Sequence, residues 1–228
     1  MPNVSSLLMP ARNSRDRRTA HEPLWLEWVT LAGLFAFAGW LLGVRGVWAL
    51  LLSSDPTGIT LVIIIVFVGA TLWCGRRARE LEMQHRRARQ AKAASGPEGG
   101  EGWVADYWRA LRARPVDEDA PLDLLMEHCQ GPHGTAWWVN GIQLKLGLLG
   151  KVIGFSILAL QIGQMQNFDP SQSQELLKNL TTGLGVALLT TMVGLVGNIL
   201  LGLQLTRLDR YADALVADIQ RAGLDIRG

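Results

Sequence analysis

The sequence predicts an all-α fold: a polytopic membrane protein with four transmembrane helices and long helices that extend into the cytoplasm. Three observations lead to this prediction: four long apolar segments, basic residues confined to alternate connections, and polar segments rich in helix-forming residues. A hydrocarbon core about 30 Å thick requires about 20 residues of helix. The apolar segments have about that length, and they are residues 24–52, 58–74, 142–165 and 180–205.

The first two apolar segments differ in length, and both are expected to remain in the membrane. Residues 24–52 are much longer than the apolar region of a signal peptide, and no small-residue cleavage site follows them. Residues 58–74 are close to the minimum length for a span. Their core, LVIIIVFVGATLW, carries no charge and is too long for a typical buried strand, so we interpret it as a span as well.

Basic residues indicate which connections face the cytoplasm. Residues 1–23 contain four arginines, residues 75–140 contain ten lysines or arginines, and the tail after residue 205 contains four. The SSDPTG connection has none, and residues 166–179 contain only Lys178. By the positive-inside rule, both termini and the long middle segment are expected in the cytoplasm, with the two short connections outside.

The apolar segments and their connections divide the chain into five parts. Two peripheral spans come first, a polar segment follows, and the two most informative spans come last. The parts are a cytoplasmic tail (residues 1–23), transmembrane helices one and two (24–74), a cytoplasmic helical loop (75–140), transmembrane helices three and four (141–205) and a cytoplasmic C-terminal helix (206–228).

The cytoplasmic loop contains three predicted helices. RRARELEMQHRRARQAKAA lacks glycine and proline and is expected to continue the second transmembrane helix until SGPEGGEG ends it. WVADYWRALRAR is an amphipathic helix with Trp103, Tyr107 and Trp108 near one face, and it lies either on the membrane surface or on a neighbouring helix. A short helix over residues 122–129 is expected between loops.

The chain after the fourth apolar segment is also predicted to be helical. Apolar residues recur at helical spacing at Leu208, Leu215 and Ile219. We therefore expect a cytoplasmic continuation of the fourth transmembrane helix.

Several residues that could mark other sites have simpler explanations. Cys74 and Cys129 both fall on the cytoplasmic side, where thiols stay reduced, so no disulfide is expected. His128, Cys129 and His133 form an HCxxxH pattern that could hold zinc, but no fourth ligand stands at a recognised spacing, and a polar loop explains them.

The arginine run in residues 76–89 is expected from topology and lipid charge, so it does not by itself indicate RNA binding. No GxSxG, Walker A, HExxH or carboxylate pair indicates an enzyme.

The third and fourth spans each carry one face of small and polar residues. Small residues allow helices to approach closely, and in lipid this packing drives helix association. The polar members of these faces, such as Gln161 and Asn198, also need partners or water. Helix packing is expected at Gly147, Gly150, Gly183, Ala187 and Gly202, and the faces continue through Gln143, Gly154, Thr190 or Thr191, and Gly194.

Lys151 is the most informative residue of the third span. A lysine near mid-membrane costs about 2.5 to 3.5 kcal/mol on insertion scales, and such residues generally face a bundle interior or a wet cavity. Lys151 lies about nine residues, or roughly 13 Å, inside the span, too deep for its side chain to reach the headgroups. Neither of the last two spans contains Asp or Glu. Either desolvation leaves the amine neutral, or another chain supplies a carboxylate; we favour the second interpretation, which predicts a partner.

The last two spans resemble a known family. LKLGLLGKVIGF, followed by GLGVALLTTMVGLVGNILL, is similar to the two pore-lining helices of the MotA/TolQ/ExbB proton-channel family, which have patterns such as GLLGTVxG and GxxxALLxTxxGL. The resemblance covers residues 142–205. The four-span plan with a large cytoplasmic loop looks more like MotA than like the three-span TolQ or ExbB.

The resemblance implies a ring of five copies around two copies of a single-span partner of the MotB/TolR/ExbD type, whose transmembrane aspartate carries the proton. It implies a location in the inner membrane of a Gram-negative bacterium, with the third and fourth helices lining a central pore. Thr191 matches the threonine of the family's fourth-helix motif. The resemblance and the polar faces together predict an ion path lined by Lys151, Gly154, Thr190, Thr191, Gly194 and Asn198.

Two residues depart from the family pattern. Lys151 stands where the usual residue is threonine, and Val186 stands where ExbB-like sequences have glutamate. A lysine facing the partner's aspartate would either keep that aspartate ionised or block the passage of cations. The expected function is a subunit of an ion-driven motor, with protons as the expected ion. The alternative is a structural membrane scaffold that packs through its glycine faces and recruits cytoplasmic partners.

Overall fold

The computed structural model describes residues 24–55, 57–93, 102–113, 119–163 and 170–227. Every regular element in these ranges is a helix, so the all-α prediction is confirmed. The predicted tail, residues 1–23, and nearly all of the predicted break after residue 94 lie outside the described ranges. The helices are α1 (Leu24–Val44), α2 (Val47–Ser54), α3 (Ile59–Ala93), α4 (Trp103–Arg112), α5 (Ala120–Gly163) and α6 (Pro170–Arg227).

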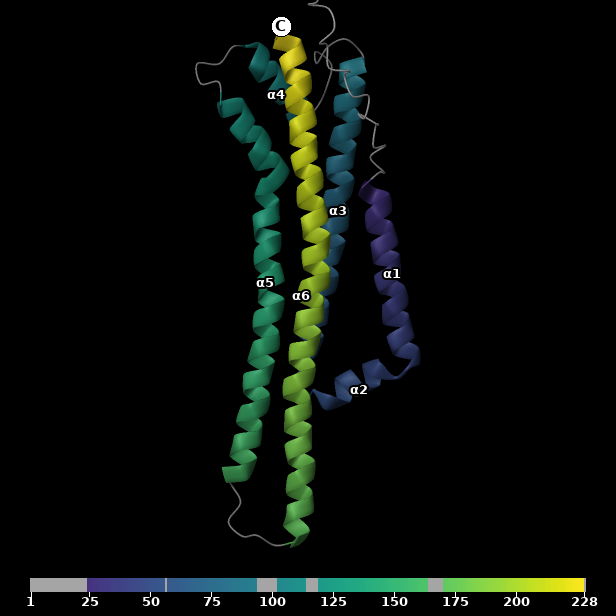
Figure 1. Cartoon of the computed structure of the whole chain (residues 1–228), viewed down its shortest axis with the longest axis vertical. Helices are drawn as coiled ribbons and strands as arrows, with labels where there is room; N and C mark the ends of the chain where they lie inside the picture. Colours follow the sequence, from purple (N-terminus) through teal and green to yellow (C-terminus); the bar gives the residue numbers. More distant parts are fainter. Residues whose placement is uncertain (1–23, 56, 94–101, 114–118, 164–169, 228) are drawn as a thin grey trace, which may run out of the picture.

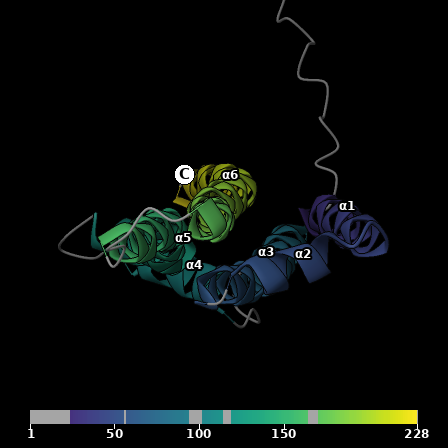
Figure 2. The ribbon, with the colours of Figure 1, turned by 90° about the horizontal axis from the view of Figure 1, so that it is seen from below.

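Four of these helices are long and apolar enough to cross a membrane, namely α1, α3, α5 and α6. This agrees with the predicted number of spans and supports a multi-pass membrane protein. Three of the four helices continue far beyond their apolar parts, to 35 residues in α3, 44 in α5 and 58 in α6. These three pack side by side along the long axis of the molecule, and α1 stands at one edge (Figures 1 and 2).

The first apolar segment is broken, although a single span over residues 24–52 was expected. Helix α1 ends at Val44, and α2 turns away from it after Gly46, whose φ of 73° is a left-handed conformation that glycine adopts at little cost (Figure 1). The indole N–H of Trp48 donates a hydrogen bond to the carbonyl oxygen of Gly39 at 2.9 Å. The bulky side chain of Trp48 therefore folds back onto α1 and fixes the turn.

The predicted short helix over residues 122–129 is also wrong, because α5 runs without a break through Pro132. A proline inside a helix has no N–H, and it leaves the carbonyl oxygen four residues earlier without a donor. That oxygen belongs to His128, and here it accepts a hydrogen bond from the guanidinium of Arg77 on α3. The same guanidinium nitrogen lies 3.1 Å from the carbonyl oxygen of Cys129. Arg77 thus replaces the missing donor and allows the helix to continue.

Helices α5 and α6 form a long antiparallel hairpin. The connection was expected over residues 166–179, but α6 already begins at Pro170, a residue suited to the first position of a helix. The predicted continuation beyond residue 205 is part of the same helix. We call the end of the molecule that holds Gly163 and Pro170 the hairpin end, and the opposite end, where α4 packs, the α4 end.

Helices α1, α2 and α3 stop short of the hairpin end (Figure 1). The ring of Phe67 on α3 lies 3.9 Å from the position that a Cβ of Gly197 on α6 would take. From Phe67 back to the start of α3 at Ile59 is about 12 Å at 1.5 Å per residue, and a similar distance along α6 leads from Gly197 to Thr190. The start of α3 is therefore level with Thr190, and the α5–α6 hairpin projects beyond it.

Helix α4 packs on its neighbours, the second of the two alternatives that the sequence left open. Trp108 is 1% exposed, and its indole N–H donates a hydrogen bond to the carbonyl oxygen of Ile219 on α6 at 3.2 Å. Tyr107 is also buried. The core at this end joins α3, α4, α5 and α6, and it includes Ala78, Leu81, Val104, Leu125, Cys129, Leu208, Ala212, Leu215 and Ile219.

Candidate functional site

The contact between α5 and α6 is built from glycine, alanine and threonine. A Cβ on Gly150 would lie 2.6 Å from Oγ1 of Thr190, and one on Gly154 would lie 3.0 Å from the backbone nitrogen of Ala187. Ordinary van der Waals contacts of a Cβ begin near 3.4 Å, so neither position accepts a larger residue without movement. The two helices approach as closely as small residues permit.

The same contact continues along both helices. A Cβ on Gly183 would meet Leu158 at 3.4 Å, one on Gly202 would meet the amide nitrogen of Asn140 at 3.4 Å, and Gly147 faces Gly194. The structure thus places all of the residues assigned to packing from the sequence along the α5–α6 contact. They are Gly147, Gly150, Gly183, Ala187 and Gly202.

The two candidate threonines lie differently. Thr190 is 0% exposed and is enclosed by the contact, as are Gly154 and Gly194. Thr191 is half-buried at the edge of the contact. Its hydroxyl lies 2.8 Å from the carbonyl oxygen of Ala187 on its own helix and 3.2 Å from that of Gly147 on α5, so it can donate to either.

Lys151 lies outside the contact. Its side chain is exposed, and within the described ranges its ammonium has no hydrogen bond or ion pair; its nitrogen is 6.0 Å from the ring centroid of Phe155. Lys151 follows Gly147 by four residues, so it stands one turn farther along the side of α5 that Thr191 meets. On α6, two turns after Thr191, the amide nitrogen of Asn198 donates to the carbonyl oxygen of Asn140 at 2.9 Å.

Five of the six predicted ion-path residues therefore fall into two groups, and the sixth, Asn198, donates a hydrogen bond across to Asn140 on α5. Thr190, Gly154 and Gly194 are inside the α5–α6 contact. Lys151 and Thr191 are beside it, on a flank of the hairpin that also exposes several large apolar side chains. We call this surface the Lys151 flank, and its apolar members are Leu148 (48% exposed), Phe155 (39%), Leu188 (58%) and Leu195 (46%).

The position of Lys151 along the long axis depends on whether α5 or α3 is taken as the reference. Within α5, Lys151 is near the middle of the apolar part, as expected. Relative to α3, it is level with the first turn, because the adjacent Gly150 packs on Thr190. The sequence could not predict this offset, because it depends on the position at which α3 packs along α6.

Two buried carboxamides near this contact have atoms without a partner in the described structure. Gln143 is 0% exposed, and neither its amide oxygen nor its amide nitrogen has a hydrogen bond; the amide oxygen of Asn140 is also unpaired. Buried amides are costly unless they are satisfied, commonly by ordered water. Gln143 belongs to the polar face predicted from the sequence, but its burial opposite Gly197 was not predicted.

The HCxxxH residues are separated by the continuous helix. His128 is exposed, and its Nδ1 lies 2.7 Å from the carbonyl oxygen of Leu124. His133 is 3% exposed, and its Nδ1 lies 2.7 Å from a carboxylate oxygen of Asp209 on α6. The other oxygen of Asp209 accepts a hydrogen bond from the indole of Trp137 at 2.8 Å. Within the described ranges, no three His, Cys, Asp or Glu residues are grouped so that they could hold a metal ion.

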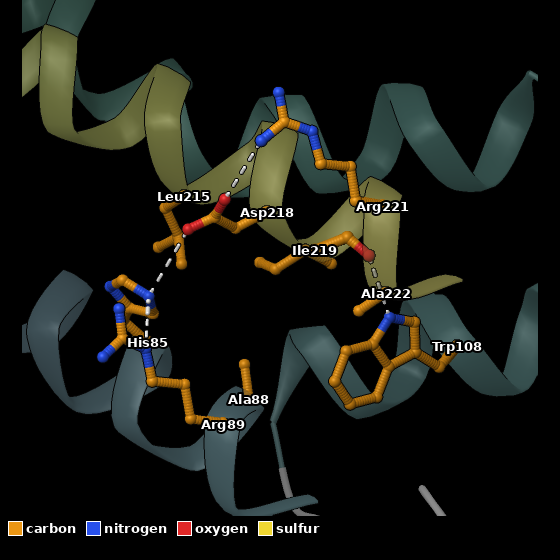
Figure 3. A pocket seen from close by; sticks show the side chains of 9 residues that line it. All are labelled: His85, Ala88, Arg89, Trp108, Leu215, Asp218, Ile219, Arg221 and Ala222. Atoms are coloured by element: carbon orange, nitrogen blue, oxygen red, sulfur yellow. Dashed lines mark hydrogen bonds and ion pairs between the residues drawn. The ribbon is translucent and has the colours of Figure 1, made fainter. Parts of the chain in front are cut away.

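A cavity of about 250 Å³ opens at the α4 end, between α3, α4 and α6 (Figure 3). Trp108, Leu215 and Ile219 give it apolar walls, and His85 stands on its charged side, with Nε2 3.7 Å from a carboxylate oxygen of Asp218. Its polar groups are engaged by one another, since Arg89 donates to His85 at 3.1 Å. The cavity is far from the Lys151 flank along α6.

Comparison with family models, with curated proteins and with solved structures finds no match for this chain.

Proposed function

We propose that this chain is a ring-forming channel subunit of an ion-driven motor complex, similar to MotA, TolQ and ExbB. The observation that supports the proposal most strongly is the position of Lys151. It is a cation on the apolar Lys151 flank, one turn from the contact between Thr191 and Gly147, with no carboxylate of the described chain beside it. Such a charge needs a counter-charge or water when the flank is covered. The transmembrane aspartate of a single-span partner would supply that counter-charge.

The close contact of α5 and α6 suits the wall of a channel. Helices whose backbones touch cannot shift without losing contacts along several turns, so the Lys151 flank keeps its shape. In the proposed complex, Lys151 and Thr191 face the partner helix. Thr190, Gly154 and Gly194 support them from behind and would not touch the ion themselves.

The exposed side chains of the Lys151 flank support assembly with further chains. The four large apolar residues of this flank are 39–58% exposed, and α3 begins at about their level. We propose that neighbouring copies in a pentamer, together with two partner helices, cover this surface. In the proposed complex, the α4 end and both termini are in the cytoplasm of a bacterium and the hairpin end is on the outer side of the inner membrane; the concentration of basic residues near the α4 end supports this orientation.

One observation favours the alternative function, that of a structural membrane scaffold. Thr190, Gly154 and Gly194 are fully used by packing within one chain, so the small-residue faces have an explanation that needs no pore. Under this alternative, Lys151 has no role in activity, and its replacement would leave activity unchanged.

The test is to purify the tagged chain with its co-purifying proteins, reconstitute it in vesicles and measure proton flux with a pH-sensitive dye. A pentameric mass and a single-span partner with a transmembrane aspartate are expected. Lys151→Met and Thr191→Val should change the flux about tenfold, equivalent to about 1.4 kcal/mol, at unchanged membrane abundance. Lys145→Met and Thr181→Val are matched controls, since both residues are exposed on the same helices.

Two results would contradict the proposal. One is a non-pentameric particle without any single-span partner. The other is an unchanged flux or phenotype in Lys151→Met, which would favour the scaffold.

A further inference from the structure

His133 is buried and pairs with the half-buried Asp209, and this pairing leaves one ring nitrogen of His133 as an acceptor. A carboxylate can only accept hydrogen bonds, so with Asp209 ionised and His133 neutral the proton of His133 is on Nδ1, which lies 2.7 Å from Asp209. The indole N–H of Trp137 donates to the second carboxylate oxygen at 2.8 Å. Both oxygens are therefore engaged, and Nε2 of His133 carries a free lone pair.

That lone pair is enclosed by the protein. His133 is 3% exposed, and Nε2 has no hydrogen-bond partner within the described ranges. The indole of Trp73 on α3 lies nearly perpendicular to the imidazole, with ring centroids 6.3 Å apart. A buried acceptor of this kind needs a donor, and a water molecule or its protonated form is the smallest donor that could serve.

The pair stands between the Lys151 flank and the α4 end. His133 precedes Lys151 by about 27 Å along α5, at 1.5 Å per residue. The charged groups that act on His133 are Asp209 and Asp213 on α6 and Arg77 on α3. Burial has the largest effect and holds the pKa of His133 below its ordinary value of 6.5; Asp209 and Asp213 favour a positive charge on the ring, and Arg77 opposes it.

We propose that His133 and Asp209 form a proton-binding site at the α4 side of the membrane part. Nε2 of His133 accepts a proton from a protonated water: the N–H bond forms, the O–H bond breaks, and the imidazolium remains paired with Asp209. In transport, which rests on the function proposed above, the site receives protons that have passed the Lys151 flank and releases them to water at the α4 end. His133 acts by binding the proton, and Asp209 is a positioning residue.

The site is tested first without any partner, by NMR of the full chain with isotope-labelled histidine in nanodiscs. The chain has four histidines, and His133→Gln assigns the signal of interest. At high pH we expect a neutral ring with the proton on Nδ1, which becomes doubly protonated as the pH falls. Asp209→Asn should weaken proton binding about tenfold or more. Asp213→Asn, the control with a more distant and exposed carboxylate, should have a smaller effect. A ring that stays neutral down to pH 5, or that titrates identically in Asp209→Asn, would overturn the site.

The transport role is tested by proton flux in the reconstituted complex. His133→Gln should lower the flux about tenfold, while His85→Gln, at the cavity of the α4 end, should leave it unchanged. Normal flux in His133→Gln would overturn the transport role while the proposed function stands. Absence of flux in the wild type would overturn the proposed function, and with it the transport role, and the titration would still decide whether the site exists.

Discussion

Gly194 of α6 and Gly147 of α5 bring two helix backbones into direct contact. A Cβ on Gly194 would lie 3.0 Å from the Cα of Gly147 and 2.8 Å from the carbonyl oxygen of Gln143. Both atoms belong to the backbone, so no change of rotamer could make room for a methyl group. The two helices would have to move apart, and this would weaken the contact over several turns.

Gly194→Ala is therefore expected to destabilise the chain by about 1–3 kcal/mol, the usual cost of overpacking. The measurement is the Tm of the purified protein in detergent. Gly185→Ala is the matched control: it lies on the same helix, nothing is within 4 Å of its Cβ position, and alanine favours helix by about 0.5–1 kcal/mol over glycine. Its Tm should be unchanged or higher. Equal losses in both variants would contradict the close contact at Gly194.

Gln143→Met is expected to stabilise the chain, by about 1–3 kcal/mol, because it removes a buried amide without a protein partner and conserves volume. Gln204→Met is the comparison: the oxygen of this amide also has no partner in the described structure, but its nitrogen donates to Thr71 at 3.2 Å, and the loss of this bond should lower the Tm. A lower Tm in Gln143→Met would contradict this prediction and would indicate that ordered water satisfies the amide.

Asp55 is expected to make the stability of the start of α3 depend on pH. Its carboxylate accepts hydrogen bonds from the backbone N–H groups of Thr57 at 2.9 Å and Thr60 at 2.7 Å. Burial disfavours the charged form, but the hydrogen bonds from these two threonines outweigh it and hold the pKa of Asp55 below its usual value of 3.8. The ionised group therefore stabilises the fold above its usual pKa, and this contribution is lost as the pH falls through the lower folded value.

Asp55→Asn should consequently cost about 1 kcal/mol at neutral pH, as the loss of a helix cap does. The Tm difference between the variant and the wild type should shrink as the pH falls below 3.8. A difference that stays constant over this pH range would show that the charge of Asp55 does not contribute.

Both cysteines are expected to resist modification in the folded chain. Cys74 and Cys129 are free thiols, 2% and 0% exposed. Maleimide should label them only after unfolding, and mass spectrometry would count the adducts. Glu127→Cys, at an exposed position of α5 outside its apolar segment, serves as the positive control and should react at once. Rapid labelling of Cys129 in the wild type would contradict the packing of α4 and α5 at this end.

The number and kind of the helices could be predicted because apolar length and helix propensity are local properties. The helix boundaries depend on distant residues. Pro132 remains inside α5 because Arg77, more than 50 positions earlier, donates to the carbonyl oxygen of His128 that proline leaves unpaired. The break at Gly46 likewise depends on Trp48 folding back onto α1. Residue patterns contain neither of these contacts.

The candidate site was predictable to a similar degree. The small-residue stripes were visible in the sequence, but adjacent positions on a helix point about 100° apart, and spacing alone could not separate Thr190 from Thr191 or Gly150 from Lys151. Asp209 was missed because a single aspartate in a polar helix ordinarily faces solvent. Its pairing with His133, 76 positions away, follows only from the alignment of α5 with α6.

The short reach of α3 has a consequence for the surrounding lipid. From Ile59 to Cys74 its apolar part spans roughly 24 Å, whereas that of α5, over residues 142–163, spans roughly 33 Å. A hydrocarbon core about 30 Å thick is thicker than the apolar part of α3 is long and thinner than that of α5. Such a mismatch costs a fraction of a kcal/mol per ångström. Thinned lipid would border α3 and stretched lipid would border the hairpin. When two molecules contact each other through their α5–α6 hairpins, the stretched lipid between them is removed. Hydrophobic mismatch would therefore favour association of the molecules.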